Sequence, residues 1–355
     1  MWNEKIDSEE AIILPESSLS TPDNQEGKEL PTEVVQERLL SPEEKLEIFS
    51  TAIESGVSAA LQMIADRFEN SPDEKNRLAF HNTKHTKDVI RRFDAIIDAV
   101  KQSDPALYDK RTHDVGRFAA AHHDTVQNWE AVPTTNELPN GEIFIKIIRK
   151  RFGGANEKES TDGALAIMDE INEEVGSEIF TEEDRAIVGG GHEATVPGFN
   201  PEKGTVIQPN LNEQSSLITR AIALADLGTA GMDGPEHFLP EGDALFREEN
   251  IDIEEAVKHP ETISPQQKEF FRERMLGWSA FQEKFAAGRS ALLEEELQPL
   301  PEASRAVIEK LFDKFNDSIQ AAHAQAEQRK TLTFEELAIA MGYTLGHPEH
   351  ITQVY

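Results

Sequence analysis

The sequence is organised around residues 80–89, which read Phe80-His81-Asn82-Thr83-Lys84-His85-Thr86-Lys87-Asp88-Val89. Apolar residues continue beyond Val89 at spacings of three or four, and this period predicts an amphipathic helix. His85 precedes Val89 by four residues, so it lies on the inward face of that helix. His81 precedes His85 by four and faces the same side if the helix reaches that far back.

Two later stretches supply the same kinds of side chain: Ala120-Ala121-His122-His123-Asp124 and Leu224-Ala225-Asp226-Leu227. The first falls at the expected end of a helix, where neighbouring side chains can converge. The second lies in a segment, 215–230, that is apolar nearly all round. An unpaired carboxylate there is costly, so a cation is expected beside Asp226. Neutral imidazoles and carboxylates are also the ligands of hydrolytic metal ions.

Composition narrows the class of protein. The chain has 355 residues, of which 67 are acidic and 35 basic, and its formal net charge is -32. Such a charge disfavours nucleic acids and anionic membranes as general partners. No uninterrupted apolar run approaches the ~20 residues that span a bilayer, and the N-terminus lacks a signal-peptide pattern. With no cysteine, thiolate ligands and nucleophiles are excluded. We expect a cytoplasmic protein without a membrane partner.

The chain divides into a tail and a body. Residues 1–44 hold twelve acidic and three basic residues without an apolar period, which predicts a disordered acidic tail. Residues 45–355 are expected to form a single all-α domain, with a metal-site core at about 75–232 and further helices at about 264–345. Loops are expected at 125–155, 194–213 and 231–264, and a helix break at Gly189-Gly190-Gly191. No convincing strand alternation is present.

Three motifs in this order resemble the successive signatures of the HD superfamily of metal-dependent phosphohydrolases: Phe80-His81-Asn82-x-x-His85, Ala121-His122-His123-Asp124 and Ala225-Asp226-Leu227-x-x-x-Gly231. The resemblance implies an all-α helical bundle with His85, His123, Asp124 and Asp226 as metal ligands. A bacterial branch of predicted HD hydrolases is similar in further detail, including Asn156-Glu157-x-x-Ser160. Phe80 replaces the tyrosine usual there. The resemblance covers roughly residues 75–232.

Three further residues are candidate catalytic groups. His81 is placed either to protonate a leaving oxygen and contact phosphate, or to cap its helix as a structural residue. His192 follows three glycines that would deliver it from a mobile loop, toward the substrate or a second ion. Glu157 is either a water-orienting residue, as the resemblance implies, or a first-turn carboxylate favoured by the helix dipole. His122 is expected to point away from His123 in a structural role.

The function expected from these features is hydrolysis of a phosphate monoester, phosphodiester or nucleotide by metal-activated water. One or two divalent ions per chain are expected, chosen among Mn, Fe, Co, Zn and Mg, with a small phosphorylated substrate as partner. Two alternatives stay open. One is an HD-fold di-iron oxygenase that uses His192 with His81 or His122 as extra ligands. The other is a catalytically inactive HD module that binds a ligand or serves as a scaffold.

Overall fold

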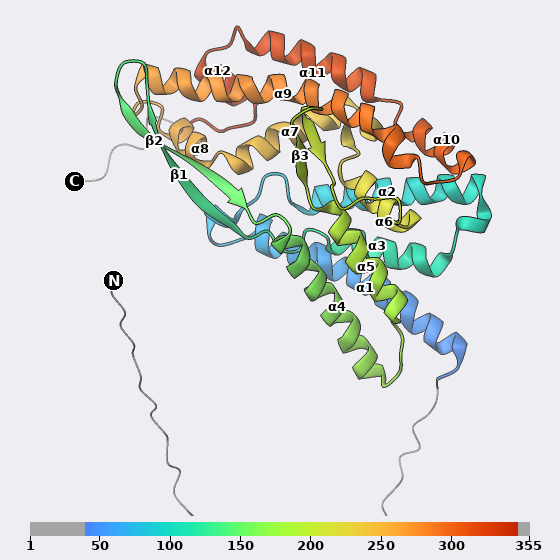
Figure 1. Ribbon diagram of the computed structural model, residues 1–355. Helices are drawn as coiled ribbons and strands as arrows, with labels where there is room; N and C mark the ends of the chain where they lie inside the picture. Colours follow the sequence, from blue (N-terminus) through green and yellow to red (C-terminus); the bar gives the residue numbers. More distant parts are fainter. Residues whose placement is uncertain (1–39, 347–355) are drawn as a thin grey trace, which may run out of the picture. The chain divides into compact units, whose positions relative to one another are not determined.

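The computed structural model describes residues 40–346, and Figure 1 shows the arrangement of their helices and strands. This part of the chain contains twelve α-helices and two short two-stranded sheets, so the predicted all-α fold class is confirmed. Most of the predicted tail, residues 1–39, lies outside the described residues. The helices are α1 Pro42–Ile64, α2 Thr83–Ser103, α3 Lys110–His122, α4 Ala155–Val175, α5 Glu182–Thr195, α6 Leu217–Asp226, α7 Pro235–Glu249, α8 Ile251–Lys258, α9 Pro265–Leu297, α10 Glu302–Leu311, α11 Phe315–Arg329 and α12 Phe334–Ala340.

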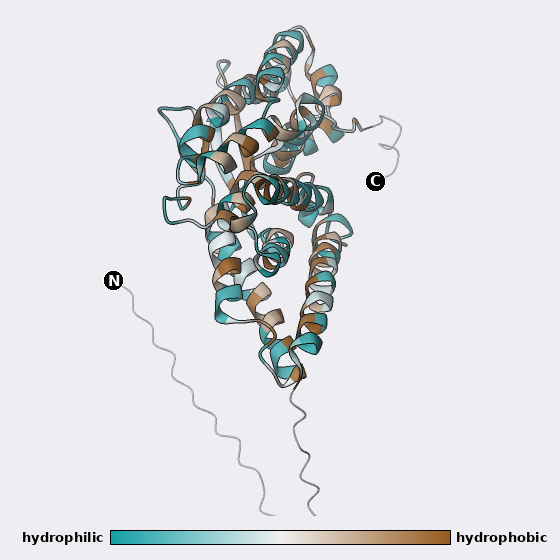
Figure 2. Ribbon diagram, turned by 90° about the vertical axis from the view of Figure 1, so that its right-hand side faces the viewer, coloured by the Kyte–Doolittle hydropathy of each residue, from teal (hydrophilic) through white to brown (hydrophobic). Residues whose placement is uncertain are grey.

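The helices bury their apolar faces in two main clusters. In the larger one, α2, α3, α5 and α6 pack through fully buried side chains such as Phe93, Phe118 and Ile222. The second joins α8, α9 and α12 around Ile253 and Leu337. Helices α9 and α11 run side by side (Figure 1). The helices alternate between hydrophilic and hydrophobic residues, the colouring expected of amphipathic helices (Figure 2).

The first helix begins as its sequence indicates. The Ser41 hydroxyl accepts the Glu44 amide at 3.2 Å, and the Glu44 carboxylate accepts the Ser41 amide at 2.9 Å. This reciprocal pair satisfies two amides that a helix start leaves free. Together with the π-helical turns Ala65–Glu69, α1 is long and apolar enough by composition to cross a membrane. Because Phe49, Ile53 and other residues of α1 are buried in the larger cluster, it serves here as a core helix.

The prediction of a loop at 125–155 was wrong. Strand β1, Trp129–Glu137, pairs antiparallel with β2, Ile143–Arg151, from Trp129↔Arg151 to Glu137↔Ile143. Pro133 hides the strand pattern, but a two-stranded hairpin has only edge strands, where proline is tolerated. The expected 194–213 loop likewise contains a small hairpin, β3 Gly198–Asn200 with β4 Thr205–Ile207.

The helix break predicted at Gly189-Gly190-Gly191 was also wrong, because α5 continues through these residues to Thr195. A Cβ on Gly191 would lie 2.7 Å from the Ile222 side chain, so this glycine allows α5 to approach α6 closely. One other boundary differs. Helix α7 occupies part of the loop expected at 231–264, despite Pro240 inside it. Within the further helices expected at about 264–345, α10 and α11 are separate helices.

Candidate metal centre

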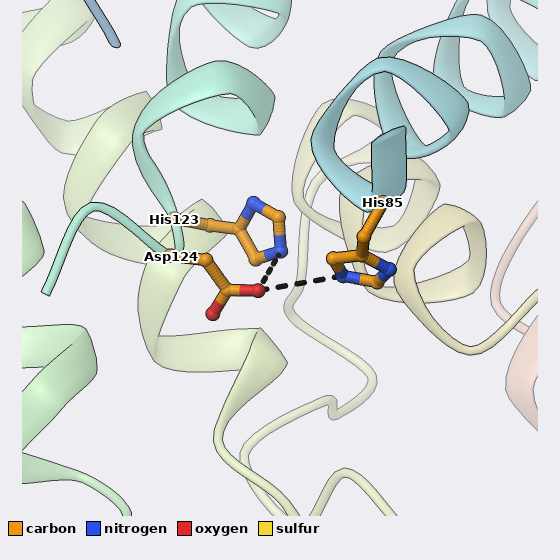
Figure 3. A group of neighbouring side chains, drawn as sticks. All are labelled: His85, His123 and Asp124. Atoms are coloured by element: carbon orange, nitrogen blue, oxygen red, sulfur yellow. Dashed lines mark ion pairs between the residues drawn. The ribbon is translucent and has the colours of Figure 1, made fainter. Parts of the chain in front are cut away.

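Four side chains from three helix ends meet in the interior. His85 lies in the first turn of α2, His123 caps the C-terminus of α3, and Asp226 is the last residue of α6. Asp124 Oδ2 lies 3.0 Å from His123 Nε2 and 3.3 Å from His85 Nε2. Asp226 Oδ1 lies 3.3 Å from His85 Nε2 and 3.7 Å from His123 Nε2. Figure 3 shows both imidazoles turned toward the Asp124 carboxylate. His85, His123 and Asp124 place ligand atoms within 4.8 Å of one another, and Asp226 faces the two histidines beside this group.

The Nε2 atoms of both imidazoles face the carboxylates. Burial lowers the pKa of His85 and of His123, but Asp124 and Asp226 outweigh it and raise both values. His123 Nδ1 donates to the Ala120 carbonyl at 2.8 Å, so in the neutral ring Nε2 carries no hydrogen. His123 Nε2 and both ring nitrogens of His85 are buried without a hydrogen-bond partner among the described residues. A bare imidazole nitrogen beside a carboxylate oxygen is repulsive unless a proton or a cation lies between them. This donor set suits a divalent cation.

The distances also fit an ion. Metal–nitrogen and metal–oxygen bonds of ~2.1 Å separate neighbouring ligand atoms by about 3.0 Å at 90° and about 3.4 Å at tetrahedral angles. The four separations above run from 3.0 to 3.7 Å. Burial lowers the pKa of His123 and raises that of Asp124, but the attraction between the two groups outweighs both effects. The pKa of His123 therefore lies well above, and that of Asp124 well below, its usual value. The carboxylate is thus ionised, as a ligand must be.

The sequence around each ligand explains its placement. The Asn82 side chain caps α2 by accepting the amides of Lys84 at 2.9 Å and His85 at 3.2 Å, which fixes His85 in the first turn. Gln127 Nε2 donates to Asp124 Oδ1 at 2.7 Å and leaves Oδ2 facing the histidines. Arg92 is fully buried and donates to the Ala225 carbonyl at 3.0 Å, which anchors the end of α6 beside Asp226.

The Asn-Glu-x-x-Ser motif holds the loop that follows Asp124. Asn156 accepts the Asn128 amide at 2.9 Å and donates to the Asn128 carbonyl at 3.0 Å. Ser160 accepts the Val126 amide at 3.1 Å. Both motif residues are buried at the start of α4. Residues 156 and 160 therefore position the loop that carries Gln127.

A cavity of about 230 Å³ is lined by three of the four side chains; His85 is not among its lining residues. Its polar side includes His123, Asp124 and Asp226, joined by the candidate catalytic residues His81 and Glu157. One Glu157 oxygen accepts the Gly154 amide at 2.5 Å, and no described residue donates to the other. Two of the three predicted catalytic residues thus lie in the same cavity as three of the predicted ligands.

His81 is held by a glutamate that sequence reasoning missed. His81 Nδ1 lies 2.5 Å from Glu248 Oε1, and Glu248 Oε2 accepts the backbone amides of Phe80 at 2.9 Å and His81 at 3.1 Å. Burial by itself raises the pKa of Glu248, but His81 and these amides lower it to about 2. An ionised carboxylate only accepts, so Nδ1 carries the hydrogen and Nε2 is the nitrogen left for chemistry.

His192 lies elsewhere. It is fully buried in α5, and it is not among the residues that line the cavity. Its Nε2 donates to the Ala119 carbonyl at 2.9 Å, and its Nδ1 lies 3.0 Å from the Thr161 hydroxyl. Burial lowers the pKa of His192 to about 3, so it is neutral with both nitrogens engaged. The prediction that a mobile loop delivers His192 to the site was wrong, because His192 is a buried residue of α5.

His122 is likewise outside the cavity lining. Its ring stacks on Phe118 with centroids 4.1 Å apart, and its Nδ1 donates to the Phe118 carbonyl at 2.9 Å. Burial lowers the pKa of His122 to about 4, so the ring is neutral at physiological pH. These contacts agree with the structural role expected from helix geometry.

The cavity also contains two charged residues that the motifs did not indicate. The guanidinium of Arg151, at the end of β2, makes no hydrogen bond with a described residue; it forms an ion pair with Asp124 Oδ1 at 3.9 Å and interacts electrostatically with Glu248 and Glu249. Glu249 lines the same space, and burial together with the neighbouring Glu248 raises its pKa to about 7. Neither residue belongs to a motif. The hairpin brings Arg151 to the cavity, and α7 brings Glu249 there.

Other basic residues near the motifs are already paired. Lys84 contacts Glu241 at 2.7 Å and Asp88 at 2.9 Å, and Arg91 contacts Asp233 at 2.7 Å.

Comparisons of the chain with protein-family models, with curated proteins and with solved structures return no match.

Proposed function

We propose that this protein is a metal-dependent hydrolase of phosphate esters. The observation that carries the proposal is the convergence of two imidazoles and two carboxylates beside a cavity that Arg151 also lines. The order of the motifs, which resembles that of HD phosphohydrolases, supports the same reaction. The ligands would be His85, His123, Asp124 and Asp226. A bound divalent ion would supply a Lewis acid for a phosphoryl oxygen and lower the pKa of a water.

The chain's own residues have distinct parts in this proposal. Arg151 binds phosphoryl oxygens, because a guanidinium offers paired donors that match a phosphate. His81, oriented by Glu248, holds a proton at Nε2 for the leaving oxygen. The free oxygen of Glu157 accepts a hydrogen bond from a water and orients it. Gln127 keeps the Asp124 carboxylate in its ligand orientation.

The two alternatives have less support. A di-iron oxygenase needs additional histidine ligands, but His192 has both nitrogens engaged and His122 lies outside the cavity. An inactive module does not require Arg151 in the cavity or the His81–Glu248 pair beside the ligands.

The test is a hydrolysis screen of the full chain with phosphate monoesters, phosphodiesters and nucleotides. Mn, Fe, Co, Zn and Mg are supplied in turn, and Asp124→Ala is screened in parallel. Activity that depends on metal and is lost in the variant supports the proposal. Equal activity of both proteins on every substrate overturns it.

A further inference from the structure

Two walls of different chemistry line the cavity. One carries His123, Asp124 and Asp226, and we call it the metal wall. Helices α7 and α9 line the other wall with Phe238, Leu245, Trp278, Phe281 and Phe285. Ring centroids are 5.6 Å apart for Trp278 and Phe281, 6.3 Å for Phe281 and Phe285, and 5.8 Å for Phe285 and Phe238. The rings therefore form a continuous surface, which we call the aromatic wall. In Figure 1, α9 lies above α7 and α3 below it.

The aromatic wall presents carbon rather than polar atoms. The one indole nitrogen in it, Trp278 Nε1, donates to the Gly242 carbonyl at 2.9 Å and is satisfied. Trp278, Phe281 and Phe285 are only partly buried, although side chains of this kind usually complete a core. Their remaining exposure faces a space that a ligand can fill. Ring-lined apolar walls with few polar groups are typical of small-molecule sites.

One polar side chain interrupts this wall. Gln282 is 3 % exposed, lines the cavity and has no hydrogen-bond partner among the described residues. A buried amide without a partner is unfavourable. A hydrogen-bonding group on a bound molecule, or a water, would satisfy it. The wall thus suits a flat apolar group with a polar edge.

The charges in the cavity limit the number of phosphates. Of the described lining residues, Arg151 alone carries a permanent positive charge. The carboxylates of the metal wall line the same space, together with Glu241, which pairs with Lys84, and Glu249, whose pKa is raised to about 7. A single phosphoryl group can be neutralised by a divalent ion and Arg151. Each further phosphate would face carboxylates without another cation.

We propose that the cavity binds a phosphate ester with one phosphoryl group at Arg151 and an apolar, ring-bearing alcohol portion against the aromatic wall. This inference rests on the proposed function for the reaction, but its recognition step can be measured separately. The ring makes binding selective among phosphate esters, because burying its apolar surface contributes favourable free energy to binding.

The experiment measures binding by titration calorimetry to the full chain with saturating Mn²⁺. 2-Phenylethylphosphonate is compared with ethylphosphonate, which shares the head group and lacks the ring. We expect the first to bind 10- to 100-fold more tightly, from burial of one aromatic side-chain equivalent at about tenfold per 1.4 kcal/mol. Equal affinities would overturn the inference.

Two variants locate the effect. Phe281→Ala should reduce the preference for the ring about 5- to 20-fold, from loss of part of the ring contact, and leave ethylphosphonate binding unchanged. Phe270→Ala is the matched control, because Phe270 is also a partly buried phenylalanine of α9 but packs on Phe144 outside the cavity. A preference reduced equally by both variants would contradict the assigned wall.

Hydrolysis separates the two proposals. 2-Phenylethyl phosphate should have a higher kcat/KM than ethyl phosphate, and adenosine monophosphate a higher one than adenosine triphosphate at excess Mn²⁺. Hydrolysis without a ring preference would overturn the inference and leave the proposed function standing. A ring preference in binding without hydrolysis of any ester would overturn the proposed function instead. Faster hydrolysis of the triphosphate would overturn the single-phosphoryl assignment.

Discussion

The two walls of the cavity are built by different rules. The metal wall and the adjacent His85 lie at the ends of α2, α3 and α6, each fixed by local contacts such as the Asn82 cap. The aromatic wall uses residues from α7 and α9, and Arg151 reaches Asp124 from the β1–β2 hairpin, so these residues come together only in the fold. The metal wall therefore leaves a short motif in the sequence, whereas the aromatic wall leaves none. Under the proposed function, the metal wall would carry the reaction and the aromatic wall would select the substrate.

The largest expected effect on the metal wall comes from removing one of the proposed metal ligands. Asp124→Ala should abolish metal binding and reduce hydrolysis by more than the ~100-fold that loss of a supporting residue costs. Helical content should stay unchanged, since Asp124 lies in the loop after α3. Metal content by elemental analysis, circular dichroism and initial rates check this prediction.

The matched control is Asp184→Ala. Asp184 is also buried, but it pairs with Arg111 and accepts the Thr181 amide far from the cavity lining. This control should lose stability and keep its metal. If Asp124→Ala retains its metal and activity, the ligand assignment is wrong.

The next largest effect distinguishes two histidines. His81→Gln should lower kcat by about 100-fold or more and remove one limb of the pH–rate profile, because it deletes the proton held beside the leaving oxygen. Glu248→Gln should lower kcat about 10- to 100-fold by releasing the orientation of His81. Rates across the pH range measure both.

His192→Gln is the contrasting variant. It should destabilise the fold by about 1–3 kcal/mol, because it disrupts buried hydrogen bonds to Ala119 and Thr161. The activity of the folded fraction should persist. A pH–rate profile altered by His192→Gln but not by His81→Gln would reverse their assignment.

Features that are set by local sequence could be predicted, whereas features that depend on long-range contacts could not. Helix periodicity predicted α2, and the motifs predicted that His85, His123, Asp124 and Asp226 meet. The β1–β2 hairpin was missed because its strands are mostly exposed and Pro133 interrupts them. The glycines before His192 were read as a break, but helix packing, rather than chain flexibility, explains Gly191. Glu248 and Arg151 depend on long-range contacts that no local pattern encodes.

The missed arginine gives the third prediction. Arg151→Met should raise KM about 10- to 100-fold through loss of a charge-assisted hydrogen bond to phosphate, with metal content unchanged. Lys150→Met is the control, since Lys150 is the exposed neighbour and contacts Glu130 at 3.3 Å. Steady-state kinetics of both variants decide the point. An unchanged KM for Arg151→Met would remove this residue from the proposed site.

The smallest effect concerns Glu249, where the two walls meet. Its pKa is raised from 4.5 to about 7 by burial and by Glu248, so the folded state holds this proton more tightly than the unfolded state. The resulting penalty is absent below pH 4.5, grows as the pH rises toward 7 and is constant above it. Glu249→Gln should therefore gain about 1–2 kcal/mol over the wild type at pH 8, after allowance for solvent in the cavity, relative to the difference at pH 4.5. Urea denaturation of both proteins at the two pH values measures this change, in which the titration of all other groups cancels. If the difference in unfolding free energy between the two proteins is the same at both pH values, Glu249 ionises in the folded state without a penalty. Its surroundings in the cavity would then be polar.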